Sequence, residues 1–427
     1  MNRHQSNFFR WVAAGVCLLM TTGTSARADL KDAWSFQSKR YDITTDVDKE
    51  LGKEIGKHMD AVYDEYAKRM AGFRPISDVK RFPLYVWERY ETYLQFTQSK
   101  GFKADNSGGV FFWGPQGSGL STWVEGQSRL KMYYVLQHEG FHQFAFMRIH
   151  QDLPPWVNEG LAEYFGDALL IDGKLVPGKL DKERLDRMSR ALNEHKFIDF
   201  KDLMTMNNEQ WVARVTGGDA NMSHMYDMAW AVTYWLIHFK NGKYRSSLEE
   251  YLNLLNSGRG KEECFEKVFG QDLKAFQTAF EDGLPKLESD PWFTAVRRVQ
   301  FYAEVLKALH AKGVRPKDFG KLREIVIRSG MGAIVKERDI VKRDDREIQL
   351  NNESEELGFP KPAIVELVPR ADDTVPDGML ITGLKPTTIR LSWRVNKLGN
   401  LVEEITYEKR STLARKATTR AVAEKGK

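Results

Sequence analysis

A short motif near the centre of the 427-residue chain constrains its fold and chemistry most, namely His138-Glu139-Gly140-Phe141-His142. On a helix, residues four apart lie on one face with Cβ atoms roughly 5–6 Å apart, so His138 and His142 can bind one metal ion. Glu139 can reach a water molecule on that ion without binding the ion itself. The spacing therefore predicts a helix that carries two metal ligands and a general base.

The residues on both sides of this motif are apolar around the whole helix. Met132–Leu136 precede it, and Phe141 and Phe144–Met147 lie in it or follow it. A helix that is apolar on all sides is a buried one. Two histidines and a carboxylate are costly to bury without partners. A metal ion is the favoured partner, and the alternative is a pair of core histidines satisfied by hydrogen bonds.

A third metal ligand is predicted on the next helix, which follows the break at Leu153-Pro154-Pro155 and is expected to run from Trp156 to Leu170. The break lets the chain double back, which brings Glu159 beside the two histidines. Two neutral imidazoles and one carboxylate leave a zinc ion with an open fourth position, as in catalytic sites. We therefore expect one Zn²⁺ per chain.

Glu163 lies four residues after Glu159, on the same helix face. It is placed to accept the second N–H of a ligating histidine, and we expect His138 to be that histidine. The alternative is an ordinary acidic stripe on a solvated helix, which would be favoured if the histidine pair were absent.

With the motif, the segment Pro155–Phe165 (PWVNEGLAEYF) resembles the gluzincins, the relatives of thermolysin and the aminopeptidases. It resembles more closely a group of poorly characterised exported bacterial proteins with a gluzincin-like domain. The resemblance runs from about Tyr41 to Leu287 and leaves out the chain after Pro291. It implies a zinc metallopeptidase domain with an N-terminal mixed sheet and a helical C-terminal part.

The same resemblance implies two further parts of a site. A Tyr or His after the third ligand would hydrogen-bond the developing oxyanion, and both Tyr226 and His224 fall in that region. Tyr226 is favoured, and its alternative role is that of a core tyrosine. An edge strand at Gly109, Val110 and Phe111 would bind substrate backbone. Aminopeptidase relatives carry a Glu there, which this chain lacks, so an endopeptidase is favoured.

Alternation and turn signals predict an α+β fold. We expect strands at Tyr41–Thr45, Phe82–Trp87 and Gly108–Trp113, an amphipathic helix at Glu50–Met70, and a hairpin turn at Asp172-Gly173. Helical patterns dominate from Asp181 to about Leu287. The predicted organisation is a metallopeptidase domain (29–290), a charged helical linker (291–360), a small β module (361–408) and a basic disordered tail (409–427).

Residues 1–28 are predicted to be a secretory signal peptide. A basic start precedes the apolar run Trp11–Met20, and Ala26-Arg27-Ala28 precedes the expected cleavage before Asp29. The mature protein is then periplasmic or secreted. No later segment is apolar enough to span a membrane. Cys264 would be the one remaining cysteine, so no internal disulfide is expected.

The overall charge does not indicate nucleic-acid binding. The chain has 64 Lys and Arg, three of them in residues 1–28, against 59 Asp and Glu. The expected partner is a peptide or protein substrate, and the basic tail is also compatible with an anionic surface of the cell envelope.

The function predicted from these features is that of an exported zinc metallopeptidase. A second hypothesis is a catalytically silent zinc-binding scaffold that acts on cell-envelope partners. Glu139 argues against it, because a purely structural zinc site has no use for a base. A third hypothesis is an exported interaction protein without a metal.

Overall fold

The computed structural model describes residues 33–73, 79–115, 117–149, 153–216, 222–270, 272–329, 358–370, 374–395, 399 and 401–408. The chain divides into two compact units. The first comprises Met1–Lys179 and Arg184–Leu287, and the second comprises Leu180–Glu183 and Glu288–Lys427. The predicted signal peptide and basic tail lie outside the described residues.

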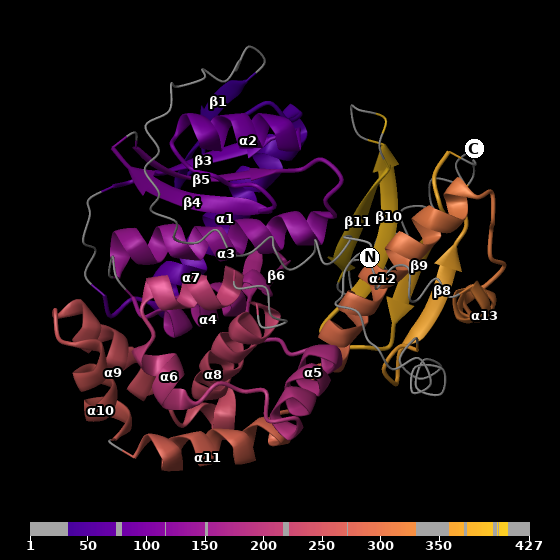
Figure 1. Ribbon diagram of the computed structural model, residues 1–427. Helices are drawn as coiled ribbons and strands as arrows, with labels where there is room; N and C mark the ends of the chain where they lie inside the picture. Colours follow the sequence, from indigo (N-terminus) through magenta and orange to yellow (C-terminus); the bar gives the residue numbers. More distant parts are fainter. Residues whose placement is uncertain are drawn as a thin grey trace, which may run out of the picture. The chain divides into compact units, whose positions relative to one another are not determined.

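The first unit begins with a five-stranded mixed sheet (Figure 1). Its strands are β1 (Trp34–Gln37), β2 (Tyr41–Thr45), β3 (Phe82–Trp87), β4 (Gly109–Gly114) and β5 (Gly117–Trp123). The order is β1-β2-β3-β5-β4, with β2, β3 and β5 parallel and β1 and β4 antiparallel to their neighbours. The predicted α+β class is confirmed. The edge strand β4 extends one residue beyond the predicted strand.

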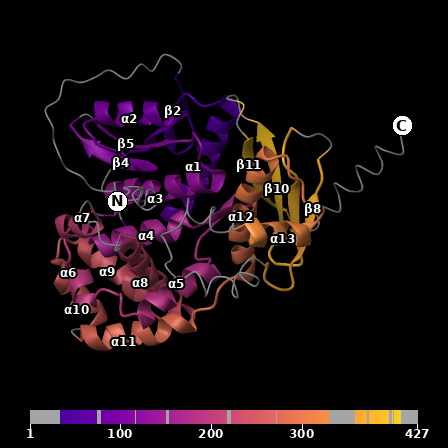
Figure 2. The same cartoon turned by 45° about the vertical axis from the view of Figure 1, so that its right-hand side comes forward.

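Three helices cover this sheet, namely α1 (Lys49–Arg69), α2 (Tyr90–Ser99) and α3 (Arg129–Arg148). In Figures 1 and 2, α2 lies on one face of the sheet while α1 and α3 lie on the other. Residues alternate across a strand. Val110 and Phe112 of β4 therefore pack in the core with Phe96 of α2, while Gly109 faces α3, where an added Cβ would lie 2.6 Å from Val135. Glycine at this position lets α3 approach the edge strand closely.

The rest of the first unit is helical apart from one hairpin, as predicted for Asp181 onward. Its elements are α4 (Pro155–Gly166), β6 (Leu169–Ile171), β7 (Lys174–Val176), α5 (Lys182–Asn193, in this unit from Arg184), α6 (Phe200–Thr205), α7 (Asn208–Thr216), α8 (Met222–Gly242), α9 (Arg245–Asn256), α10 (Lys261–Phe269), α11 (Leu273–Gly283) and the short 3₁₀ helix η2 (Leu284–Lys286). Strands β6 and β7 meet at Asp172 and Gly173, both with positive φ, so the predicted hairpin is confirmed.

Helix α4 is shorter than predicted, because it ends at Gly166 instead of Leu170. The amide of Gln137 on α3 donates to the backbone oxygens of Phe165, Gly166 and Ala168 at 2.8–3.0 Å. These bonds satisfy carbonyl groups at the helix end, and the chain then enters β6. A partner from another helix decided this boundary, and the local sequence does not show it. Strands β1 and β5 and helix α2 were also not predicted.

The approach of α4 to α8 depends on Gly160. A Cβ at this position would lie 2.4 Å from the backbone oxygen of Ala229 and 2.2 Å from Oγ1 of Thr233. These distances are far below van der Waals contact, so only glycine fits. The close packing fixes the part of α4 that carries Glu159.

The second unit contains α12 (Pro291–Ala311), α13 (Phe319–Ser329) and the antiparallel sheet β8 (Ile364–Val368), β9 (Gly378–Thr382), β10 (Thr388–Val395) and β11 (Leu401–Glu408), in the order β11-β10-β9-β8. The expected linker 291–360 therefore begins with a helix that belongs to this unit. Nε1 of Trp292 donates to the backbone oxygen of Thr387 at 3.0 Å, and the Trp292 ring packs against Tyr407. Helix α12 belongs to this unit because its buried hydrophobic side covers the sheet.

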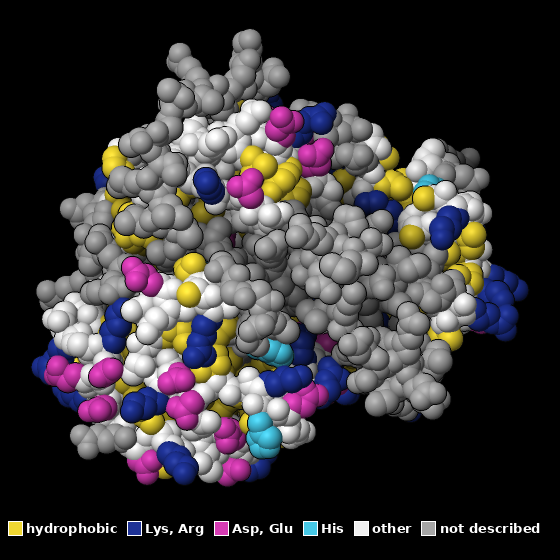
Figure 3. Space-filling view, viewed as in Figure 1, with side chains coloured by type: hydrophobic (Ala, Val, Ile, Leu, Met, Phe, Trp, Pro, Cys, Tyr) yellow, Lys and Arg dark blue, Asp and Glu magenta, His cyan; other side chains and the backbone are white. Residues whose placement is uncertain are grey.

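Among the described residues, no helix combines the length and the hydropathy needed to cross a membrane. On the face shown in Figure 3, basic and acidic side chains are intermixed over the helical part of the first unit.

Candidate metal centre

The centre of α3 is buried on all sides, as its composition predicted. Every residue from Val135 to Ala145 is buried, including Gln137, Glu139 and Gln143. Ser128 caps the start of the helix by accepting a hydrogen bond from the N–H of Lys131 at 3.1 Å. This cap fixes where the helix begins.

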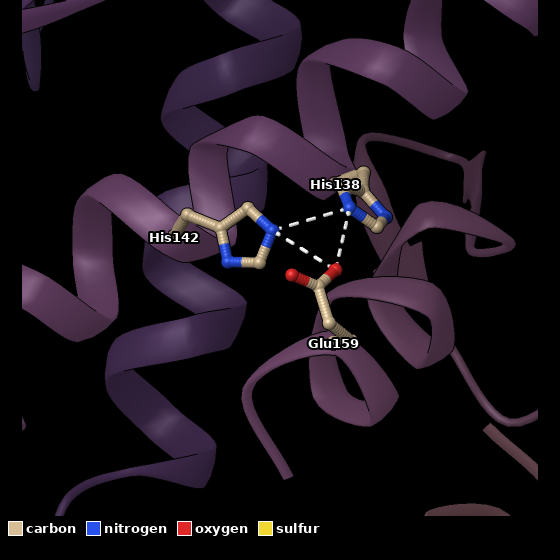
Figure 4. Close-up of side chains that lie close together, drawn as sticks. All are labelled: His138, His142 and Glu159. Atoms are coloured by element: carbon tan, nitrogen blue, oxygen red, sulfur yellow. Dashed lines mark hydrogen bonds and ion pairs between the residues drawn. The ribbon is translucent and has the colours of Figure 1, made fainter. Parts of the chain in front are cut away.

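Three side chains from α3 and α4 converge at one point (Figure 4). His138 and His142 lie one turn apart on α3, and Glu159 points at both from α4. The two Nε2 atoms are 3.2 Å apart, and each is 3.4 Å from Oε2 of Glu159. Ligand atoms bound to a tetrahedral Zn²⁺ lie about 3.3–3.4 Å from each other. The triangle therefore has the dimensions of one face of a zinc coordination tetrahedron.

The outer ring nitrogens of both histidines face oxygen atoms. Nδ1 of His142 lies 3.2 Å from Oδ1 of Asn158, and Nδ1 of His138 lies 3.4 Å from Oε1 of Glu163. With a metal ion bound, protons on the Nδ1 atoms would face these oxygens and the Nε2 atoms would present lone pairs to the ion. The predicted position of Glu163 beside His138 is thus present in the structure.

The three inward-facing atoms share one positive charge, which in the absence of a metal ion is a proton on His138. Oε2 of Glu159 and Nδ1 of His138 are buried, and neither makes a regular hydrogen bond with another described residue. Burial raises the pKa of Glu159, but the contacts with His142 and His138 outweigh it and hold the pKa at about 2. Burial lowers the pKa of His138, and Glu159 and Glu163 outweigh that and raise it to about 10. The site thus attracts positive charge, and its nitrogen and carboxylate donors suit Zn²⁺.

Glu163 has two further partners that the sequence did not reveal. Its Oε1 accepts a hydrogen bond from the Tyr134 hydroxyl, and its Oε2 accepts one from Arg184 at 2.8 Å. Burial raises the pKa of Glu163, but the contacts with His138 and Arg184 outweigh it and lower the pKa well below its usual range. Tyr134 precedes His138 by one turn of α3, so its spacing in the sequence could have indicated that it lies near the partner of His138. Arg184 lies 21 residues away, and no local pattern indicates it.

Glu139 lies beside the triangle and contacts the edge strand. Its Oε2 accepts a hydrogen bond from the backbone N–H of Phe111 at 2.9 Å. The side chain is buried, and burial raises the pKa of Glu139. Among the described strands, β4 pairs with β5 alone and forms an edge of the sheet. The predicted substrate-binding residues Gly109, Val110 and Phe111 therefore lie on an edge strand, next to the predicted base.

The two candidates for the oxyanion donor have different surroundings. The ring of Tyr226 lies 6.4 Å from that of His138 and 5.7 Å from that of Trp211. Burial, then the charge of Glu159, raises the pKa of Tyr226 well above its usual value. Tyr226 lies on α8, about one turn after the helix begins at Met222.

His224 is half-buried, and the structure does not bring it to the metal centre. Burial lowers its pKa, and the strongest charges acting on it are those of Asp227, Lys196, Arg187 and Glu194, none of which is a predicted metal ligand. His224 and Tyr226 are two residues apart on α8, which is about 200° around the helix, so their side chains leave opposite sides of it. Sequence spacing alone could not decide whether Tyr226 or His224 is the oxyanion donor.

Residues 134–254 match a known protein family. Its description is "Protein of unknown function (DUF1570)". The match covers less than a third of the chain, but it includes the three candidate ligands, Asn158, Glu163, Arg184 and Tyr226. The five-stranded sheet lies outside it. No curated protein is significantly similar to the chain.

Proposed function

We propose that this protein is a zinc-dependent metallopeptidase of the gluzincin type, exported by its N-terminal signal peptide. The observation that carries the proposal is the convergence of His138, His142 and Glu159, whose possible ligand atoms lie 3.2–3.4 Å apart. A zinc ion held by these atoms would supply an activated water molecule and polarise a peptide carbonyl.

The base in this proposal is Glu139, which follows the first ligand and has its carboxylate in the same buried region. A buried carboxylate within reach of the attacking water can accept its proton and later pass it to the leaving amine. The hydrogen bond from Phe111 keeps this carboxylate from rotating freely. Its presence favours an enzyme over the silent zinc-binding scaffold.

Strand β4 is the proposed binding surface for the substrate backbone, because an edge strand has unpaired backbone groups that an extended peptide can join. No acidic side chain occurs from Ser107 to Gly114, so nothing in that segment would bind a free amino terminus. We therefore propose cleavage within a peptide chain. Tyr226 is the proposed donor to the oxyanion, since its ring lies 6.4 Å from that of His138 and the charge of Glu159 acts on its hydroxyl.

The test uses the mature chain from Asp29 and its Glu139→Gln variant. Zinc per chain is measured by mass spectrometry of the metal, and a mixture of peptides is digested and analysed by mass spectrometry of the products. We expect one zinc per chain in both proteins and internal cleavage by the unaltered protein alone. One zinc without cleavage would support the scaffold hypothesis, and absence of zinc would overturn the proposal.

A further inference from the structure

Arg184 is a buried arginine that contacts several carboxylates next to the metal centre. It lies on α5 and is 7% exposed. One terminal nitrogen donates to Asp167, and the other donates to Glu163 at 2.8 Å and lies 3.5 Å from Asp227. The guanidinium also lies 4.0 Å from the ring centroid of Trp230, so an aromatic ring packs against it in addition to its contacts with the carboxylates.

The carboxylate of Glu163 is held at both of its oxygens. Oε2 accepts from Arg184, while Oε1 accepts from the Tyr134 hydroxyl and lies 3.4 Å from Nδ1 of His138. The carboxylate cannot rotate without breaking one of these contacts. Its orientation toward His138 is therefore fixed from the side opposite the metal centre.

From this arrangement we infer that Arg184 is a positioning residue of the metal centre, which acts through Glu163 on the orientation of His138. This inference rests on the proposed zinc binding. The ring of His138 presents Nε2 to the metal only while Nδ1–H has an acceptor in the correct place. Arg184 keeps that acceptor in place without touching a ligand itself.

The charges explain why an arginine is needed. Glu163 on α4 and Asp167, the residue that caps the end of α4, lie four residues apart, and both are buried. Two like charges at this spacing repel, and a buried carboxylate without a partner is strongly destabilising. The planar guanidinium can donate to both at once, whereas a lysine ammonium is a point charge on a flexible chain. Without Arg184, Glu163 would turn away from His138.

Arg187 offers a matched control on the same helix. It donates to both oxygens of Asp227, at 2.7 and 3.0 Å, and its side chain is 40% exposed. It therefore shares the carboxylate of Asp227 with Arg184 but is not bonded to Glu163. Replacing Arg187 removes a neighbouring positive charge but leaves the contact between Arg184 and Glu163 in place.

The experiment measures zinc affinity of the mature chain at fixed pH by competition with a chromogenic chelator. We expect Arg184→Met and Glu163→Gln each to weaken zinc binding by roughly 10- to 100-fold. The double variant should bind zinc no more weakly than Glu163→Gln alone, because both substitutions act through the same contact between Glu163 and His138. Arg187→Met should stay within about 2-fold of the unaltered protein. Unchanged affinity in Arg184→Met, or additive losses in the double variant, would overturn the inference.

If Arg184→Met does not fold, Arg184→Lys provides the test. The lysine retains the buried charge but not the fork that joins Glu163 to Asp167, so we expect a smaller loss, between about 3- and 10-fold, in a folded protein. Unaltered affinity in that variant would contradict the inference. If the unaltered protein binds zinc and the Arg184 variants bind it equally well, the inference alone fails. If the unaltered protein binds no zinc, the proposed function fails.

Discussion

Oε2 of Glu139 accepts a hydrogen bond from the backbone N–H of Phe111 at 2.9 Å, which joins the proposed base on α3 to the edge strand β4. The N–H that bonds Glu139 is directed away from β5, toward the free edge of the sheet. A substrate strand added to β4 would therefore lie beside the base, and to pair with the N–H of Phe111 it would have to displace the Glu139 carboxylate. This contact connects the two halves of the proposed mechanism, proton transfer and backbone binding.

Replacing Glu139 by Gln should remove hydrolysis without removing the metal. The amide has the size of the carboxylate, but it cannot accept the proton from water, so we expect kcat to fall by roughly 10²- to 10⁴-fold. Turnover of an internally cleaved peptide and zinc content of the same preparation provide the measurement. Turnover near that of the unaltered protein would exclude Glu139 as the base.

Tyr226 and His224 can be separated by a pair of variants. Tyr226→Phe removes only the hydroxyl, and we expect kcat to fall by roughly 10²- to 10³-fold while zinc affinity is unchanged. His224→Asn should change kcat by less than about 2-fold, since the charges that act on it are those of Asp227, Lys196, Arg187 and Glu194, which are not ligands. Steady-state kinetics of both variants is the test, and the reverse pattern would assign the oxyanion role to His224.

Gly160→Ala should destabilise the contact between α4 and α8. The new Cβ would lie 2.4 Å from the backbone oxygen of Ala229, so we expect the free energy of unfolding to fall by about 1–3 kcal/mol. Gly72→Ala is the control, because its Cβ would have no neighbour nearer than 3.9 Å and its φ is not positive. Urea denaturation of both variants is the measurement, and equal stability would show that the helices can move apart without cost.

The stability of the protein should fall in mild acid in part because of His58. Its Nε2 lies 2.8 Å from Oε1 of Gln137, and burial lowers the pKa of His58 to about 4. The unfolded chain, with a pKa of about 6.5, therefore binds a proton that the folded protein does not. Stability from the neutral ring is present above pH 6.5 and is lost as the pH falls toward 4.

His58→Gln tests this expectation, since the amide can donate to Gln137 but does not titrate. Between pH 7.5 and pH 5, the unaltered protein should lose about 2 kcal/mol more of its unfolding free energy than the variant loses. Urea denaturation at both pH values gives the two differences, and each protein serves as its own reference. Equal losses would show that His58 ionises without cost in the folded state.

The ligand set was predictable because its geometry is local. His138 and His142 lie one helical turn apart in any α-helix, and the proline break before α4 gives the chain a place to turn back toward them. The apolar flanks of the motif predicted burial, and α3 is buried throughout its centre. Strands β2 and β3 were predicted with their observed bounds for a similar reason, since alternation is a property of consecutive residues.

The partners behind the ligands were decided by the tertiary structure. Arg184 reaches Glu163 from a separate helix, and Gln137 ends α4 from a neighbouring one. Neither contact has a fixed sequence spacing, because it depends on how helices pack. The same holds for the surroundings of Tyr226 and His224, which are two residues apart in the sequence but differ in the groups that pack around them. Sequence determined which atoms could bind a metal, and packing determined what holds them in place.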